Sequence, residues 1–139
     1  MISVKDLPMT ILDYAGVEHP KTKYKDRKIA APSGLTARPF LEGASDDVRT
    51  ENDWYAFELF GNGYIMQGDY KAMKVRKGMF GDGEWHLYNV VADPSEMNPL
   101  EGDMPKEFES MKALYMAYAE ANNIIEVDQA WNPFKAASE

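Results

Sequence analysis

Side chains that commonly carry out nucleophilic, acid–base or metal chemistry are sparse in this chain. Its 139 residues include no cysteine and two histidines, His19 and His86. His86 stands between Trp85 and Leu87 in an apolar, strand-like run, where a packed or hydrogen-bonded imidazole is expected. His19 stands in a polar segment, where it could reach a ligand, although a surface role is favoured. No HExxH or EF-hand spacing, nucleophile elbow or phosphate-binding glycine motif is present. The residues alone therefore support no enzyme assignment, and we predict no catalytic residue and no metal ligand.

One short segment concentrates positive charge on an otherwise acidic chain. Five basic residues fall between positions 21 and 28, while the formal net charge of the chain is −8. Together with His19 they form our candidate site for an anionic ligand, and a solvated basic face is the more common alternative. The candidate residues are His19, Lys21, Lys23, Lys25, Arg27 and Lys28. The net negative charge argues against nonspecific binding to nucleic acid or to an anionic membrane.

Composition predicts one globular domain spanning 1–139. Apolar residues make up 45% of the chain and aromatic residues 12%, which is enough for a hydrophobic core. No apolar run approaches the roughly 18 residues that a membrane-spanning helix needs. The first residues lack the basic and then apolar pattern of a secretory signal. The absence of cysteine leaves the cellular compartment undecided.

The stretch from Trp54 to Asn98 is expected to form the sheet around which the rest of the chain is organised. Aromatic and β-branched runs alternate there with Gly-containing breaks, a pattern typical of an antiparallel meander. We predict strands near 54–60, 63–67, 69–75 and 84–91. Large side chains at both odd and even positions indicate that both faces of this sheet are covered.

Helical patterns flank the meander. Residues 7–15 predict a short amphipathic helix, with Asp6 as N-cap and Gly16 after its end. Residues 18–34 are expected to be a long surface loop, and 35–43 to contain one helical turn. Asp103 is expected to cap a second, amphipathic helix that ends at 122–123 and packs on the sheet. Residues 122–139 are expected to form an extended tail, in which Trp131 and Phe134 pack against another surface. The predicted class is α+β, with about four antiparallel strands.

Five short motifs, taken in chain order, resemble the C-terminal part of bacterial arylsulfatases, which belong to the alkaline phosphatase superfamily. The match covers roughly residues 3–121. Three motifs depart from the usual pattern: Pro8 falls one position early, Thr36 replaces a common serine, and Pro99 stands where asparagine or aspartate is often found. The motifs are Asp6-Leu7-Pro8-Met9-Thr10-Ile11-Leu12; Gly34-x-Thr36 with Pro39-x-Leu41-x-Gly43; Gly68-Asp69-Tyr70-Lys71; Trp85-x-Leu87-Tyr88-Asn89; and Asp93-Pro94-Ser95-Glu96 with Leu100.

The resemblance implies a small subdomain, an antiparallel sheet with a C-terminal helix, that docks on a larger α/β domain and contributes loops to the active-site rim. Sulfatases attack the ester with a formylglycine made within a Cys/Ser-x-Pro-x-Arg motif, and they hold calcium with acidic and amide side chains upstream of the matched region. This chain has no cysteine and no Ser-x-Pro-x-Arg sequence. Formylglycine and calcium would therefore belong to a catalytic domain outside the chain, and we expect no cofactor in the chain itself.

These observations favour a structural, cleft-shaping subdomain of a sulfuric ester hydrolase that is not catalytic by itself. Its expected partner is a catalytic sulfatase domain or a second copy of the same chain. One alternative is a free-standing binding or oligomerisation module for sulfated and other anionic ligands. Another is a small hydrolase with an unrecognised carboxylate site. The substrate and the compartment stay open, since members of the family are often periplasmic or cytoplasmic in bacteria.

Overall fold

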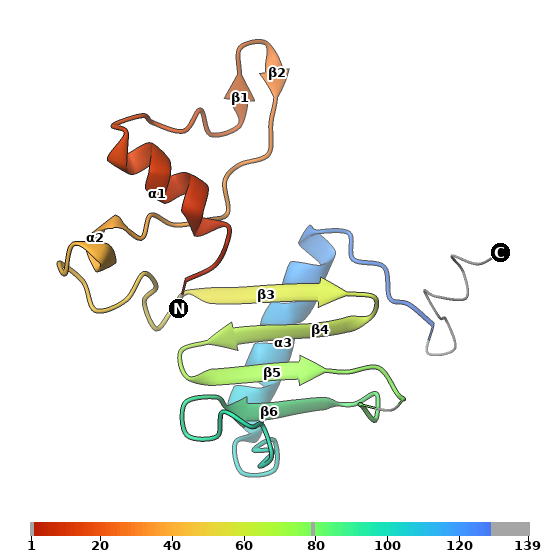
Figure 1. The fold of residues 1–139 in the computed structure, drawn as a ribbon. Coiled ribbons are helices and arrows are strands. Elements are labelled where there is room, and N and C mark those ends of the chain that lie inside the picture. Colours follow the sequence, from red (N-terminus) through yellow and green to blue (C-terminus); the bar gives the residue numbers. More distant parts are fainter. Residues whose placement is uncertain (1, 79, 129–139) are drawn as a thin grey trace. The chain divides into compact units, whose positions relative to one another are not determined.

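The computed structural model describes residues 2–78 and 80–128, and the chain divides into two compact units, 1–50 and 51–139. We describe each unit by itself (Figure 1). The expected packing of Trp131 and Phe134 falls outside the described residues. The prediction of a single domain over 1–139 is not tested by this division and stays a prediction.

The first unit contains two helices and a small hairpin. Helix α1 spans Asp6–Tyr14, strands β1 and β2 span Lys23–Tyr24 and Arg27–Lys28, and the single turn of α2 spans Arg38–Leu41. The hairpin corrects the expectation of a structureless loop over 18–34. Lys23 pairs with Lys28 and Tyr24 with Arg27 across a two-residue turn, in which Lys25 has a φ of 53°. Two-residue polar strands leave no alternation pattern, and sequence reasoning had nothing to detect.

Helix α1 begins and ends one residue earlier than predicted, and its buried side is polar. Asp6 and Thr10 are its buried residues, whereas Leu7 and Ile11 are 54% and 67% exposed. Asp6 is the first residue of the helix rather than its N-cap, which is Lys5. The carboxylate of Asp6 is turned to partners elsewhere in the unit, so it is not used as a cap.

The second unit is an antiparallel sheet with one helix on it, as predicted. Strands β3 (Trp54–Leu59), β4 (Asn62–Gln67), β5 (Tyr70–Lys74) and β6 (Trp85–Asn89) are neighbours in chain order. Phe60 and Gly61 join β3 to β4, and both have positive φ, as a type I′ hairpin turn requires. Strands β3, β5 and β6 are shorter than predicted by one to three residues, because turns take residues at their ends, whereas β4 begins one residue earlier than predicted.

Helix α3 (Pro105–Ala121) crosses one face of the sheet (Figure 1). The buried residues of the sheet beneath it are small or aliphatic and lie in one cross-strand row: Ala56, Ile65, Ala72 and Leu87. The helix contributes Met111 and Tyr115 to the same core. Asp103 does not cap this helix. Met104 occupies the N-cap position without a side-chain capping hydrogen bond, and Pro105 opens the first turn.

The second face of the sheet is not covered by α3. Strand alternation places Tyr55, Phe57 and Leu59 of β3 there, with Tyr64 and Met66 of β4 beside them. We call these five residues the open face. Phe57 and Leu59 are 42% and 50% exposed. The expectation that this face is also covered stays a prediction.

Among the described helices, none is long and apolar enough to cross a membrane.

Candidate functional site

The predicted basic site lies on the β1–β2 hairpin. All five basic side chains are exposed, and the register sets Lys23 directly opposite Lys28. His19 precedes the hairpin, and its Nδ1 accepts a hydrogen bond of 3.0 Å from the backbone N–H of Lys21. Lys21 pairs with Glu18 at 3.4 Å, and Lys25 lies 5.5 Å from the centre of the Tyr24 ring. The structure therefore places the five basic residues on or beside one hairpin, with their side chains exposed.

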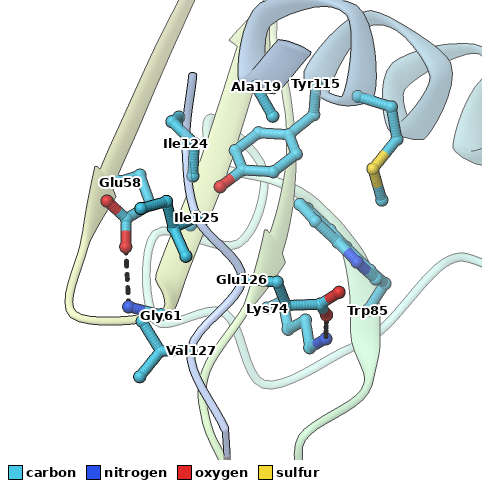
Figure 2. Close-up of a pocket in the computed structure, with 12 residues that line it drawn as sticks. Glu58, Gly61, Lys74, Trp85, Tyr115, Ala119, Ile124, Ile125, Glu126 and Val127 are labelled. Carbon is cyan, nitrogen blue, oxygen red and sulfur yellow. Dashed lines mark hydrogen bonds and ion pairs between the residues drawn. The ribbon is translucent and has the colours of Figure 1, made fainter. Parts of the chain in front are cut away.

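A pocket that sequence analysis did not find lies beneath the C-terminal half of α3. Its floor is one cross-strand row of the sheet, in which Glu58 pairs with Gly63, Gly63 with Lys74, and Lys74 with Trp85. Residues in the last turns of α3 and in the segment 124–127 complete the walls. The volume of the cavity is about 190 Å³. Its further lining residues are Gly61, Tyr115, Met116, Ala119, Ile124, Ile125, Glu126 and Val127 (Figure 2).

Tyr115 reaches down to the sheet because Gly63 has no side chain. A Cβ built on Gly63 would stand 2.1 Å from the Tyr115 hydroxyl oxygen, so any larger residue would push the tyrosine away. The Tyr115 ring packs edge-on to Trp85, with ring centres 4.7 Å apart. Burial raises the pKa of Tyr115 to about 12, and the nearby Glu58 carboxylate adds to the rise. The hydroxyl is therefore a protonated donor at neutral pH.

Charged groups surround this hydroxyl. One Glu58 carboxylate oxygen accepts a 2.6 Å hydrogen bond from the Gly61 amide, and Lys74 pairs with Glu126 at 3.4 Å. Glu126 is 89% exposed, so its contact with Lys74 is a weak surface ion pair. Figure 2 shows Glu58 and Lys74 on the same lining as Tyr115. The pocket thus combines apolar walls with a hydroxyl donor, a carboxylate acceptor and an ammonium group.

The first two family-like motifs meet in the first unit. The Thr10 hydroxyl donates to the Asp6 carbonyl at 2.8 Å and accepts from the Ala37 amide at 2.9 Å. The Thr36 hydroxyl donates to the Asp13 carboxylate at 2.7 Å. Gly34 passes so close to Lys5 that an added Cβ would stand 1.9 Å from the Lys5 carbonyl oxygen. These motif residues join α1 to the following segment.

A buried ion pair completes this joint. Arg49 donates two hydrogen bonds of 2.8 Å to the two carboxylate oxygens of Asp6. The amides of Ser3 and Leu35 donate to the same carboxylate at 2.7 and 2.9 Å. Burial alone would raise the pKa of Asp6, but the Arg49 and amide hydrogen bonds outweigh it and lower the pKa to about 2. We call Asp6, Thr10, Leu35, Ala37 and Arg49 the polar clasp.

The remaining motifs are joined in the second unit. Lys71 pairs with Glu96 at 2.7 Å and lies 5.1 Å from the centre of the Tyr64 ring. Asp93 accepts hydrogen bonds of 2.8 Å from the Met97 and Asn98 amides. These motif residues therefore join segments of the second unit to one another.

His86 is hydrogen-bonded, as its strand position predicted. Its Nδ1 lies 2.9 Å from Glu101 and its Nε2 lies 2.9 Å from Asp82. The Glu101 hydrogen bond raises the pKa of His86, burial opposes that rise, and Asp82 adds to it. Glu101 also accepts the Leu87 amide at 3.2 Å. When protonated, the imidazolium ties the turn before β6 to the segment that leads into α3.

Across 2–78 and 80–128, no group of three or more His, Asp or Glu side chains is arranged to hold a metal ion. The pocket could not have been found from sequence, because Glu58, Gly63, Lys74 and Trp85 become neighbours only through the strand register. The one available signal was the glycine at position 63 within a strand-like run.

The chain is similar to sulfatases in sequence. No protein-family model matches it. An uncharacterized sulfatase of Schizosaccharomyces pombe is 29% identical over 126 residues, which are 89% of this chain and 22% of the relative. The predicted resemblance is thereby confirmed. The chain spans less than a quarter of that relative's length.

Solved structures share the fold. The BT33336S-sulf structure, from work on the metabolism of multiple glycosaminoglycans by Bacteroides thetaiotaomicron, has 19% identity and a TM-score of 0.61 over 81% of this chain and 24% of that one. A protein in complex with its substrate D-glucosamine-2-N,6-O-disulfate has 24% identity and a TM-score of 0.52 over 83% and 23%. Ps i-CgsB has 16% identity and a TM-score of 0.61 over 98% and 28%.

Proposed function

We propose that this chain is the structural, cleft-shaping C-terminal part of a sulfatase-type sulfuric ester hydrolase and is not catalytic by itself. The observation that carries the proposal is the exposed apolar side of α1. A helix that buries Asp6 and exposes Leu7 and Ile11 by more than half has its apolar side available for another surface. The similarity to only 22–28% of sulfatase chains supports a partner that supplies the rest.

The occupant of this apolar side is the catalytic domain, which we place outside the chain together with formylglycine and calcium. Ile2, Val4, Tyr14 and Val17 are also about half exposed or more and extend the surface around α1. Monomeric proteins rarely leave a contiguous apolar patch above a few hundred Å² in water. At roughly 25 cal/mol per Å², covering such a patch is worth several kcal/mol and offsets part of the association cost. The open face of the sheet is a second surface of this kind.

An association assay tests this proposal. The S. pombe sulfatase, shortened by the segment that matches this chain, is mixed with the wild-type chain, and complex formation is measured by light scattering. We expect a complex that Ile11→Glu weakens at least tenfold, because a buried carboxylate would lack a partner. Tyr24→Glu, an equally drastic change at an exposed aromatic on the hairpin, is the control and should bind normally. A chain that stays monomeric alone and binds no shortened sulfatase would contradict the proposal.

Catalysis gives a second, independent test. The isolated chain should not turn over aryl sulfates, with or without calcium, because it lacks the sequence from which formylglycine is made. Heat-inactivated protein and Lys71→Ala serve as controls. Turnover that follows the wild-type protein through purification would overturn the non-catalytic assignment.

A second candidate function is anion binding by the hairpin, alone or in a homo-oligomer. The observation that favours it is the direct pairing of Lys23 with Lys28, since like charges placed opposite each other are destabilising without a counterion. A heparin column eluted with a salt gradient tests it. We expect weak, salt-sensitive retention that is lost in a Lys23→Glu, Lys28→Glu double variant. Retention that persists at high salt or in this variant would assign binding to another surface.

A further inference from the structure

We infer that the pocket beneath α3 binds a small neutral molecule with one aromatic ring and a hydroxyl group, a simple phenol being the plainest example. The inference is independent of the sulfatase proposal, since every lining residue belongs to the unit that begins at residue 51.

Size sets the first limit on the ligand. The cavity of about 190 Å³ is somewhat larger than an engineered apolar cavity of roughly 150 Å³ that binds benzene. One six-membered ring with a small substituent fits such a volume. Trp85 and Tyr115 provide aromatic walls, and Met116, Ala119 and Ile124 provide aliphatic ones. Rings pack edge-on or offset against such walls with a gain beyond the area they bury.

The Tyr115 hydroxyl is a hydrogen-bond donor that a ligand in the pocket can use. The side chain is 8% exposed, and none of the hydrogen bonds within the described residues involves its hydroxyl. The hydroxyl oxygen is not among the fully buried atoms without a partner, so water reaches it from the pocket, and a ligand that supplies an acceptor replaces that water. Glu58, close enough to raise the pKa of Tyr115, has acceptor capacity beyond its bond to Gly61. A hydroxyl group can accept from Tyr115 and donate to Glu58 at once.

Charge decides against ionic ligands. A carboxylate would gain from Lys74 but would meet the negative side chains of Glu58 and Glu126. An ammonium group would gain from the two glutamates but would meet Lys74. Moving either ion into a mainly apolar pocket also removes its hydration. A hydroxyl group needs only the two hydrogen bonds that Tyr115 and Glu58 can make with it. A neutral ligand is therefore preferred to a charged one of equal size.

The segment 124–127 gives the ligand a way in. It has no regular secondary structure, and Ile125 is 82% exposed. The Ile124 amide donates to the Ala119 carbonyl at 2.9 Å, and Glu126 adds the weak ion pair with Lys74. Arg76 donates to the Asp128 carbonyl at 2.7 Å just beyond the segment. Because Ile125 is exposed and the Lys74–Glu126 pair is weak, the segment can move aside without unfolding the sheet.

Titration of the full chain with phenol, followed through backbone amide NMR shifts, tests the inference. We expect saturable shifts at Gly63, Lys74 and Ala119 with a dissociation constant on the order of 1 mM, as for a ligand of seven heavy atoms. Benzoate and benzylamine, of similar size but charged, should bind at least tenfold more weakly. Absence of saturable shifts with phenol, or equal binding of either ion, would overturn the inference.

Two tyrosines on the same helix provide the matched variants. Tyr115→Phe removes the hydroxyl in the pocket, and Tyr118→Phe makes the same chemical change one turn away, where the ring packs against Trp54. Tyr115→Phe should weaken phenol binding roughly three- to tenfold, as expected for one hydrogen bond, and Tyr118→Phe should not. Ala119→Leu should fill the cavity and abolish binding. Equal effects of the two phenylalanine variants, or unchanged binding in Ala119→Leu, would place phenol elsewhere.

Discussion

In the first unit the buried side chains of α1 are an aspartate and a threonine, whereas in the second unit the fully enclosed side chains include Ile65 and Leu87. The polar clasp holds α1 through a bidentate ion pair and hydrogen bonds, and it leaves apolar residues exposed. The sheet and α3 instead enclose an apolar core and keep charged groups at its edges. The comparison teaches that the first unit depends on charge and pH, and the second on packing.

The largest effect should come from breaking the ion pair of the polar clasp. Asp6→Asn leaves the Arg49 guanidinium, 9% exposed, without its carboxylate partner, and we expect a loss of about 4 kcal/mol in the first unit. Hydrogen exchange of the Ala37 amide reports this loss. Asp13→Asn, in a pair with the half-exposed Arg38, is the matched control and should have a much smaller effect. Equal exchange in both variants would mean that the clasp does not hold the unit.

The core of the second unit should respond to volume instead. Leu87→Ala removes a fully enclosed side chain, and we expect a loss of about 3 kcal/mol in the sheet. Leu59→Ala is the same change at a half-exposed position and should alter stability by less than about 0.5 kcal/mol. Chemical denaturation followed by near-ultraviolet circular dichroism measures both. Similar midpoints for the two variants would contradict an apolar core centred on Leu87.

Lowering the pH should destabilise the first unit before the second. The folded pKa of Asp6, about 2, lies below its ordinary value of 3.8. The stability from Asp6 is therefore complete above pH 4 and is lost as the pH falls towards 2, a change of about 2 kcal/mol. Amides of the first unit should lose exchange protection in this range before those of β4 and β5. Simultaneous loss of protection in both units would remove the proposed difference between them.

The smallest effect should be the pH dependence of His86 in the second unit. Its folded pKa is raised, so its contribution is complete below the ordinary value of 6.5 and is lost as the pH rises through the folded pKa. We expect His86→Ala to be destabilising by about 1 kcal/mol at pH 5.5 and by less at pH 8.5. Thermal unfolding at the two pH values measures it. His19→Ala should leave the sheet unaffected at both, and an equal effect of His86→Ala at both would show that its charge is irrelevant.

Much of the second unit was predictable because its information is local. Alternating apolar runs and Gly-containing turns indicated four strands, and the spacing of Phe108, Met111, Leu114 and Tyr115 indicated α3. Element ends shifted because caps and turns depend on neighbours: Met104 rather than Asp103 precedes α3. The five motifs were enough for the resemblance to sulfatases, since motif order survives where overall identity is low.

Tertiary structure alone decided which side of α1 is buried and where a pocket forms. The amphipathic pattern of residues 7–15 gave no sign that Asp6 and Thr10 would form the buried side of α1, where the Asp6 carboxylate gains more from Arg49 and two amides than it loses by burial. That outcome depends on a partner 43 residues away. The pocket depends likewise on the register that aligns Glu58, Gly63, Lys74 and Trp85, and on Tyr115 descending onto the glycine. Sequence by itself determines the elements, because they follow from neighbouring residues, but contacts between distant residues exist only once the chain has folded.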